Sequence, residues 1–314
     1  MKRKSIIIRI ISRLKKDGFS IVLNILFARH THRLKSIVSP TLYETINMYL
    51  RLGYWPNIRN PRSLNEKLVH QKLNVKNPLF SLVADKVKVR DYVANKVGNG
   101  ILNEVYFIGS DPRDINFDHL PSKFVIKTNH GSGWNIVVKD KDAIVKDEVI
   151  QKCQEWLKYK YSSYTKGYEA HYDNIEPRIL VEKFLEGINN DSDLDYKFYC
   201  FHGEVKFIAV DTNKDIIQNR HFYDINWNLL SFKWPEFPQE NQLQKPIQLS
   251  DMLILAEQLS EDFEFSRIDL YLSKDGVKFG EITISPGGGW DKISPVESDF
   301  KLGGLWKLVQ TAHK

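Results

Sequence analysis

The sequence predicts an α+β fold whose sheets are antiparallel. Helical patterns fill most of the first hundred residues, and strand-like runs begin at residue 102. Helices and strands then mix without the regular strand–helix–strand alternation of a doubly wound parallel sheet. With 314 residues, of which 42% are hydrophobic and 27% charged, the chain can form two or three packed subdomains.

Capping and breaking residues delimit the expected helices. Ser63-Leu-Asn-Glu66 forms a capping box, in which each side chain bonds the other residue's backbone amide. Pro40 and Pro78 mark two further starts, and Ser250 is expected to cap a later helix. The pattern predicts helices at residues 40–53, 63–73, 79–96, 142–160, 250–262 and 305–310.

Runs of alternating or β-branched residues predict the strands. Six of them lie at residues 104–108, 123–127, 136–138, 178–184, 195–201 and 205–210. Residues 267–283 read as two more strands, joined by a turn at Lys274-Asp275-Gly276 with Gly276 in the left-handed conformation. This register pairs Leu270 with Gly280.

The same register places charged side chains face to face. Asp269 lies opposite Glu281 and Arg267 opposite Thr283, with all four side chains on one face of the hairpin. Two facing carboxylates repel each other unless a cation lies between them. Mg²⁺ with bound phosphates is the expected cation. The alternative is a surface hairpin whose acids point into water.

A strand that ends in a lysine leads into a glycine-rich turn. Lys127 is followed by Thr-Asn-His-Gly131-Ser132-Gly133. Amides without a neighbouring Cβ can close over a polyphosphate, and the lysine can reach phosphate oxygens. An ordinary hairpin turn is the alternative.

A second strand, Val181-Glu182-Lys183-Phe184-Leu185-Glu186, leaves through Gly187. Its backbone groups could meet an adenine edge while Glu186 takes ribose hydroxyls. An edge strand with exposed charges is the alternative.

The net charge of +6 is unevenly placed. Residues 1–35 hold ten Lys/Arg and one acid, whereas the remaining 279 residues hold 35 basic and 38 acidic groups. We therefore expect no binding of nucleic acid by the body of the protein. The basic arm fits either an amphipathic helix on an anionic membrane surface or a helix packed on the body. Its apolar runs are shorter than the ~20 residues of a membrane span, and no signal-peptide cleavage site follows.

Cysteine and histidine usage excludes several classes of protein. Cys153 and Cys200 are the only cysteines, and the nine histidines form no His-x-x-His or His-x-x-x-His pair. A disulfide scaffold or a zinc site is therefore not expected. The pattern fits a reducing cytoplasm, with peripheral attachment to the inner membrane face if the arm binds lipid.

The ordered set of motifs resembles the TupA-like ATP-grasp family, a group associated with teichuronopeptide and other surface-polysaccharide biosynthesis. The motifs are Asp85-Lys86 with Arg90, Lys127 with its Gly-Ser-Gly loop, Val-Glu182-Lys-Phe-Leu, Asp195-Tyr-Lys197-Phe, Arg267-Ile-Asp269 and Gly-Glu281-Ile-Thr283. Ser63-Leu-Asn65-Glu66-Lys67 and Pro286-Gly-Gly-Gly289 look like hallmarks of that group. The resemblance covers about residues 55–311.

The resemblance implies an ATP-grasp fold in which two α+β subdomains clasp ATP and Mg²⁺. Lys86 and Lys127 would hold phosphates under Gly131, Ser132 and Gly133, and Glu182, Lys183, Phe184 and Leu185 would meet the adenine. Asp269, Glu281 and Thr283 would bind the metal, and Arg267 and Lys197 would be catalytic. The implied parts are a basic arm (1–40), a helical region (41–100), a small subdomain (101–187) and a C-terminal subdomain (188–314).

The implied activity is ligation of a carboxylate to an amine through an acyl phosphate, for example of an amino acid to a uronic acid in a capsular or other surface glycan. The wider superfamily usually has Glu-x-Asn where this chain has Glu281-Ile-Thr283, and a threonine hydroxyl is a weaker metal ligand. A protein that binds ATP without turnover is therefore one alternative. A metal-dependent glycosyltransferase is another, because Asp191 and Asp193 form an Asp-x-Asp motif.

Overall fold

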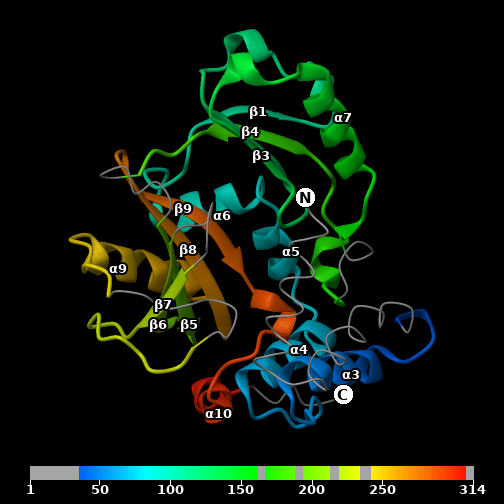
Figure 1. The fold of residues 1–314 in the computed structure, drawn as a ribbon, viewed down its shortest axis with the longest axis vertical. Coiled ribbons are helices and arrows are strands. Elements are labelled where there is room, and N and C mark those ends of the chain that lie inside the picture. The colour runs from blue at the N-terminus through cyan, green and yellow to red at the C-terminus, as the bar shows by residue number, and fades with distance from the viewer. Residues whose placement is uncertain (1–34, 162–166, 188–193, 213–218, 234–241, 309–314) are drawn as a thin grey trace, which may run out of the picture.

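The computed structural model describes residues 35–161, 167–187, 194–212, 219–233 and 242–308. Their strands form two antiparallel sheets, with the orders β1-β4-β2-β3 and β7-β6-β5-β8-β9. Figure 1 shows both sheets with helices packed around them, so the predicted α+β architecture is confirmed.

The four-stranded sheet contains β1 (Val105–Gly109), β2 (Phe124–Thr128), β3 (Asn135–Val138) and β4 (Ile179–Lys183). One face packs on helix α7 (Lys146–Leu157) through a core that includes Phe124, Ile126 and Val181. Because side chains alternate along a strand, Val125 and Lys127 point to the opposite face.

The five-stranded sheet contains β5 (Asp195–Phe201), β6 (Glu204–Thr212), β7 (Asn219–Tyr223), β8 (Phe265–Ser273) and β9 (Gly276–Thr283). On one face, Phe198 and Ile268 share a core with Met252 of helix α9 (Leu249–Ser260). The other face carries an aromatic core that includes Phe207 and Trp306. Alternation places the charged residues of β5 and β8 on this second face.

The remaining helices are α3 (Pro40–Leu52), α4 (Leu64–Asn74), α5 (Pro78–Ala84), α6 (Val89–Val97) and α10 (Val296–Gly304). The predicted capping box opens α4: Ser63 accepts from the Glu66 amide and Glu66 from the Ser63 amide. Gly303 of α10 packs directly on this start, since a Cβ there would lie 2.1 Å from the Arg62 carbonyl oxygen. None of the described helices has the length and hydrophobicity of a membrane span.

Three of the predicted helices have other boundaries in the structure. The single helix over 79–96 is two helices, because the Asp85 carboxylate accepts the Val87 amide at 2.9 Å and forms a turn between α5 and α6. Ser250 lies inside α9, which begins at Leu249 without a side-chain cap. The helix expected at 305–310 is instead α10; residues 305–308 are not helical, and 309–310 lie outside the described residues.

Candidate active site

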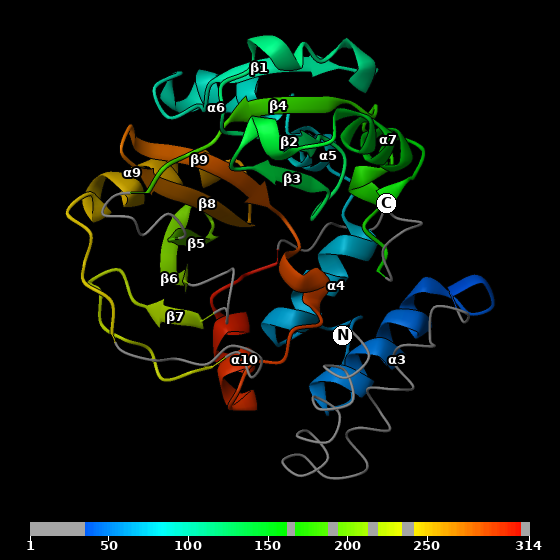
Figure 2. The same cartoon turned by 45° about the horizontal axis from the view of Figure 1, so that its top comes forward.

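A cavity of about 220 Å³ lies between the two sheets. Strands β2, β3 and β4 line one side and the β8–β9 hairpin the other, and residues of α5 and α6 complete the wall. Figure 2 shows β4 lying above β8 and β9. Seven predicted site residues line it: Lys86, Lys127, Glu182, Lys183, Phe184, Leu185 and Glu281. The other seven lie outside this lining: Gly131, Ser132, Gly133, Lys197, Arg267, Asp269 and Thr283.

Lysines and carboxylates meet in the cavity wall. Lys127 on β2 forms an ion pair with Glu182 on the neighbouring strand β4. Lys86 donates a hydrogen bond to the Gly131 carbonyl oxygen. Burial lowers the pKa of Lys86, and the negative charge of Glu281 partly opposes that shift. An anionic ligand would compensate the desolvation of this lysine, so the wall is suited to phosphate oxygens.

The linker that leaves β4 offers backbone groups to the cavity. The Lys183 amide donates to the Glu104 carbonyl at 3.0 Å, and the Lys183 carbonyl accepts from the Asn103 side chain at 2.8 Å. Both backbone groups of Lys183 are therefore engaged. Within the described part of the chain, Phe184 and Leu185 are the linker residues left to meet a nucleobase edge.

Glu186 lies elsewhere, against the tip of the β8–β9 hairpin. Its carboxylate pairs with Lys123 at 2.8 Å and with Lys274 at 3.0 Å, and its carbonyl accepts the Lys274 amide at 2.9 Å. Since Glu186 does not belong to the cavity lining, the ribose contact predicted for it has no support.

The glycine loop is anchored beside the cavity. The Thr128 amide bonds the Trp134 carbonyl at 3.1 Å, and the Asn129 side chain reaches Asp85 at 2.9 Å. A Cβ on Gly131 would lie 2.6 Å from the Trp134 ring, so this close approach requires glycine. Gly133 has φ +75° and is exposed together with Ser132. The loop tip is thus exposed beside Lys86, with Ser132 hydrogen-bonded to Tyr161.

The hairpin register agrees with the prediction at the two charged pairs. Asp269 faces Glu281 and Arg267 faces Thr283. Gly276 has φ +88°, as expected, but the turn contains two residues because Ser273 pairs with Gly276.

The predicted pairing of Leu270 with Gly280 is wrong: Leu270 pairs with Phe279, and Gly280 forms a bulge that restores the register. A Cβ on Gly280 would lie 2.8 Å from the Tyr271 ring.

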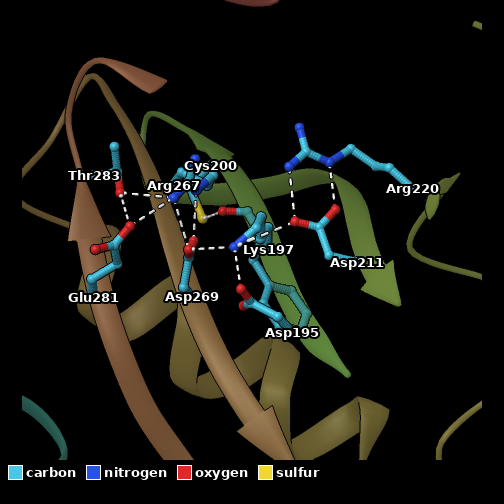
Figure 3. A network of polar contacts seen from close by, with 10 residues as sticks. Asp195, Lys197, Cys200, Asp211, Arg220, Arg267, Asp269, Glu281 and Thr283 are labelled. Carbon is cyan, nitrogen blue, oxygen red and sulfur yellow. Dashed lines mark hydrogen bonds and ion pairs between the residues drawn. The ribbon is translucent and has the colours of Figure 1, made fainter. Parts of the chain in front are cut away.

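The guanidinium of Arg267 lies between the two facing acids (Figure 3). It donates to Asp269 at 2.6 and 2.7 Å, to Glu281 at 2.8 Å and to Thr283 at 3.0 Å. Burial favours the protonated form of Glu281, but Arg267 and Lys86 hold the pKa of this carboxyl below its usual range. The repulsion that the sequence predicts is therefore relieved by a side chain of the protein.

Lys197 extends this cluster across the sheet. Its ammonium lies 2.5 Å from Asp195, 2.8 Å from Asp269 and 3.8 Å from Asp211, which in turn pairs with Arg220 at 2.5 Å (Figure 3). Burial opposes the charge on Lys197, but Asp269 and Asp195 outweigh it and raise its pKa. Asp211 and Arg220 were not predicted; a single aspartate at the end of an apolar strand is the only signal they leave in the sequence.

The family model for TupA-like ATP-grasp proteins matches residues 66–307. The chain belongs to the TupA-like ATP-grasp family. Membership assigns the ATP-grasp fold to the chain, and ATP with Mg²⁺ is the cofactor pair that this family implies. A comparison with curated proteins gave no match.

Solved structures similar to this TupA-like protein include ATP-grasp ligases. D-alanine–D-alanine ligase from Bacillus anthracis has 17% identity over 72% of this chain and 65% of its own, with a TM-score of 0.44. The Helicobacter pylori ligase has 16% identity over 72% and 62%, with a TM-score of 0.38. PsnB in complex with a precursor variant, Mg and ADP has 11% identity over 73% and 61%, with a TM-score of 0.39. The chain covers less than two thirds of the length of each, and the family assignment rests on the family model alone.

The two segments that resemble hallmarks of the TupA-like family, residues 63–67 and 286–289, lie against each other: a Cβ on Gly289 would be 3.0 Å from the Asn65 carbonyl oxygen. The Asn65 side chain of α4 donates to the Asp291 carbonyl at 2.9 Å, and Lys72 donates to the Gly288 carbonyl at 2.8 Å. The Asp291 carboxylate lies against Gly287, where a Cβ would be 2.2 Å from it. Helix α4 therefore holds the glycine-rich segment that follows β9, the strand that carries Glu281.

The residues of the hairpin fit Mg²⁺ unequally. Glu281 lines the cavity with a side chain that is 39% exposed, whereas both oxygens of Asp269 are bound by Arg267 and Lys197. No group of three or more His, Cys, Asp or Glu suited to a metal occurs in the described ranges. Mg²⁺ in nucleotide sites commonly uses one or two carboxylates together with phosphate oxygens and water. Glu281 fits that role, and Asp269 fits it only if its present contacts change.

The alternative Asp-x-Asp motif lies outside the described residues, since Asp191 and Asp193 belong to the segment 188–193. Residues 1–34 of the basic arm lie outside them as well.

Proposed function

We propose that this ATP-grasp enzyme is an ATP-dependent carboxylate–amine ligase. One observation supports the proposal most strongly. Lys86, Lys127, the linker 182–185 and Glu281 come from four distant segments, yet they line one cavity between two sheets. That cavity would lie between the small subdomain (101–187) and the C-terminal subdomain (188–314).

Each residue has a role that follows from its position. Lys86 and Lys127 bind phosphate oxygens beside Gly131, Ser132 and Gly133, and Glu182 orients Lys127. The Phe184 and Leu185 backbone meets the adenine.

The hairpin residues act on the transferred group. Glu281 and Thr283 would hold Mg²⁺, joined by Asp269 if its contacts with Arg267 and Lys197 open, and the metal would neutralise phosphate charge. Arg267 stabilises charge on the transferred phosphoryl group, and Lys197 keeps Arg267 and Asp269 in place.

The proposed reaction has two steps, transfer of a phosphoryl group and then of an acyl group. A substrate carboxylate oxygen bonds to the γ-phosphorus while the bond to the ADP oxygen breaks, which gives an acyl phosphate. The amine nitrogen then bonds to the acyl carbon, phosphate leaves, and the nitrogen loses a proton to give an amide.

We place the second substrate on the side of Glu281 away from the adenine. Tyr172 lines the cavity, and burial together with the negative charges of Glu169 and Glu281 raises its pKa. Glu169 accepts a hydrogen bond from Ser285 at 3.4 Å, just beyond the end of β9. An acidic group beside the phosphate end suits an incoming amine. In line with the family association, the pair would be an amino acid and a uronic acid of a surface-glycan precursor.

A screen for ADP release tests the function. Uronic acids and amino acids are combined pairwise with Mg·ATP, and UDP-sugars with Mn²⁺ serve as the test for a glycosyltransferase. We expect ADP only when a carboxylate and an amine are both present. A protein that binds ATP yet releases no ADP with any pair would favour the alternative without turnover.

Substitution of the cavity residues tests the site. Lys127→Ala and Glu281→Ala are expected to abolish ADP release because each removes a charged partner of the phosphates or the metal. Lys123→Ala is the matched control, since Lys123 lies just before β2 and pairs with Glu186 outside the cavity. Wild-type turnover in either cavity variant would contradict the assignment.

A further inference from the structure

Helix α3 has an apolar face that remains exposed. Leu42 and Tyr49 are 45% and 44% exposed, and they share a helical stripe with Ile46. The opposite side of the helix is buried through Tyr43 and Met48. Figure 2 places α3 at the periphery of the molecule, away from both sheets.

Aromatic residues after the helix extend this face. Trp55 is 67% exposed, and its ring lies 5.4 Å from that of Tyr49. Ile37, just before the helix, is 76% exposed. Exposed apolar side chains that gather on one surface, as Tyr49 and Trp55 do here, are typical of an interaction site.

The chain segment that carries this face is cationic. Residues 35–76 hold seven basic residues and two acids, and both acids, Glu44 and Glu66, are buried. Glu44 pairs with Lys72, and Glu66 accepts backbone amides at the start of α4. The exposed charges of this segment are therefore positive, Arg59 and Arg62 among them.

The charge is segregated along the whole chain. Residues 1–76 hold 16 of the 45 basic residues and 3 of the 39 acids, which leaves 29 basic and 36 acidic residues for the rest. A chain with one cationic end and a slightly acidic body presents that end to an anionic partner.

We propose that the exposed face of α3, formed by Ile37, Leu42, Ile46, Tyr49 and Trp55, docks onto an anionic lipid surface. Tyr and Trp side chains favour the boundary between headgroups and acyl chains, because one part of each ring system is apolar and the other polar. The exposed arginines of residues 35–76 attract acidic headgroups. This surface belongs to the folded body and is independent of the ligase activity.

Sedimentation with lipid vesicles tests the proposal on the full chain. The vesicles contain phosphatidylcholine alone or with 30% phosphatidylglycerol, at low and at high salt. The variant Tyr49→Ala/Trp55→Ala removes the two aromatic contacts, and Ile247→Ala/Ile254→Ala removes apolar side chains that are 96% and 56% exposed elsewhere. We expect the wild type and the control to bind anionic vesicles, and the aromatic variant to bind about tenfold more weakly or worse.

Fluorescence of Trp55 shows whether lipid is bound by this face or by the amino-terminal arm. The emission is expected to shift to the blue on addition of anionic vesicles, and Trp55→Phe should remove the shift. Unchanged vesicle binding by the aromatic variant would overturn the proposal, because residues 1–34 would then account for the binding. Shielding of Trp55 from acrylamide without vesicles would also overturn it, since another part of the chain or a second copy would then cover the face.

Discussion

Arg267 is the cation that separates Asp269 from Glu281. Strand alternation and a turn glycine were sufficient to predict that these three side chains share one face. The sequence did not indicate that Lys197 links Asp269 to Asp195 and Asp211, because that depends on the pairing of β5 with strands on both sides. Local periodicity predicts a face, whereas tertiary pairing decides which charges meet on it.

Lys197→Met should destabilise the fold. It leaves Asp195 and Asp269 buried without their shared cation, and breaking a buried ion pair in this way costs about 3–5 kcal/mol. Urea unfolding measures the loss. Lys206→Met is the control, because Lys206 pairs with the exposed Glu204. If Lys197→Met lowers the free energy of unfolding no more than Lys206→Met does, the buried cluster does not need its lysine.

Lys86→Met should weaken nucleotide binding without lowering the stability of the fold. Since burial lowers the pKa of Lys86, its charge opposes folding at neutral pH, and this opposition fades as pH rises through the lowered folded-state value toward 10.5. The variant without nucleotide should therefore be at least as stable as the wild type at pH 7, with an advantage that shrinks at alkaline pH.

The same variant should bind Mg·ATP about tenfold to a hundredfold more weakly, through loss of a charged hydrogen bond. Thermal unfolding across pH and calorimetric titration with Mg·ATP measure the two effects. Unchanged ATP affinity would remove Lys86 from the site.

The β8–β9 hairpin positions Glu281 through a bulge at Gly280. The bulge was not predicted. The turn is one residue shorter than expected, and the bulge adds one residue to β9, so the alternating pattern of the sequence is the same with or without these two features. For the same reason the two differences cancelled, and the charged pairs were predicted correctly.

Gly280→Ala should disturb this hairpin. A Cβ would meet the Tyr271 ring at 2.8 Å and the Asp269 carbonyl at 2.9 Å, and overpacking of this kind costs about 1–3 kcal/mol. Urea unfolding and ADP release should both deteriorate. Gly100→Ala, where a Cβ meets no atom within 4 Å, should change neither. Wild-type stability and ADP release of Gly280→Ala would show that the hairpin does not need a glycine beside Tyr271 and Asp269.

Helix and strand boundaries show where local signals suffice. The capping box at Ser63 located α4 correctly because both partners lie within one turn. The break at Asp85 was missed because that aspartate also accepts from Asn129 in the glycine loop, a contact 44 residues away. Strand β7 was missed since its Asn-Arg-His start is polar, and Arg220 is buried only through Asp211.

The proposed nucleotide site lies where the two sheets meet, and it needs residues from both of them. Neither sheet alone brings Lys127 near Glu281, and helix α4 holds the segment after β9 through Lys72 and Asn65. The family's order of motifs could therefore name the residues, but the cavity required the packing of one sheet on the other.

Hydrogen–deuterium exchange with Mg·AMPPNP examines this arrangement in the intact protein. Because the nucleotide would contact both walls, we predict slower exchange at 124–138 and 180–187 in one sheet and at 277–283 in the other, with no change in β7. Lys127→Ala should lose the protection in both sheets together. Protection confined to one sheet, or equal protection in the variant, would contradict a nucleotide site between them.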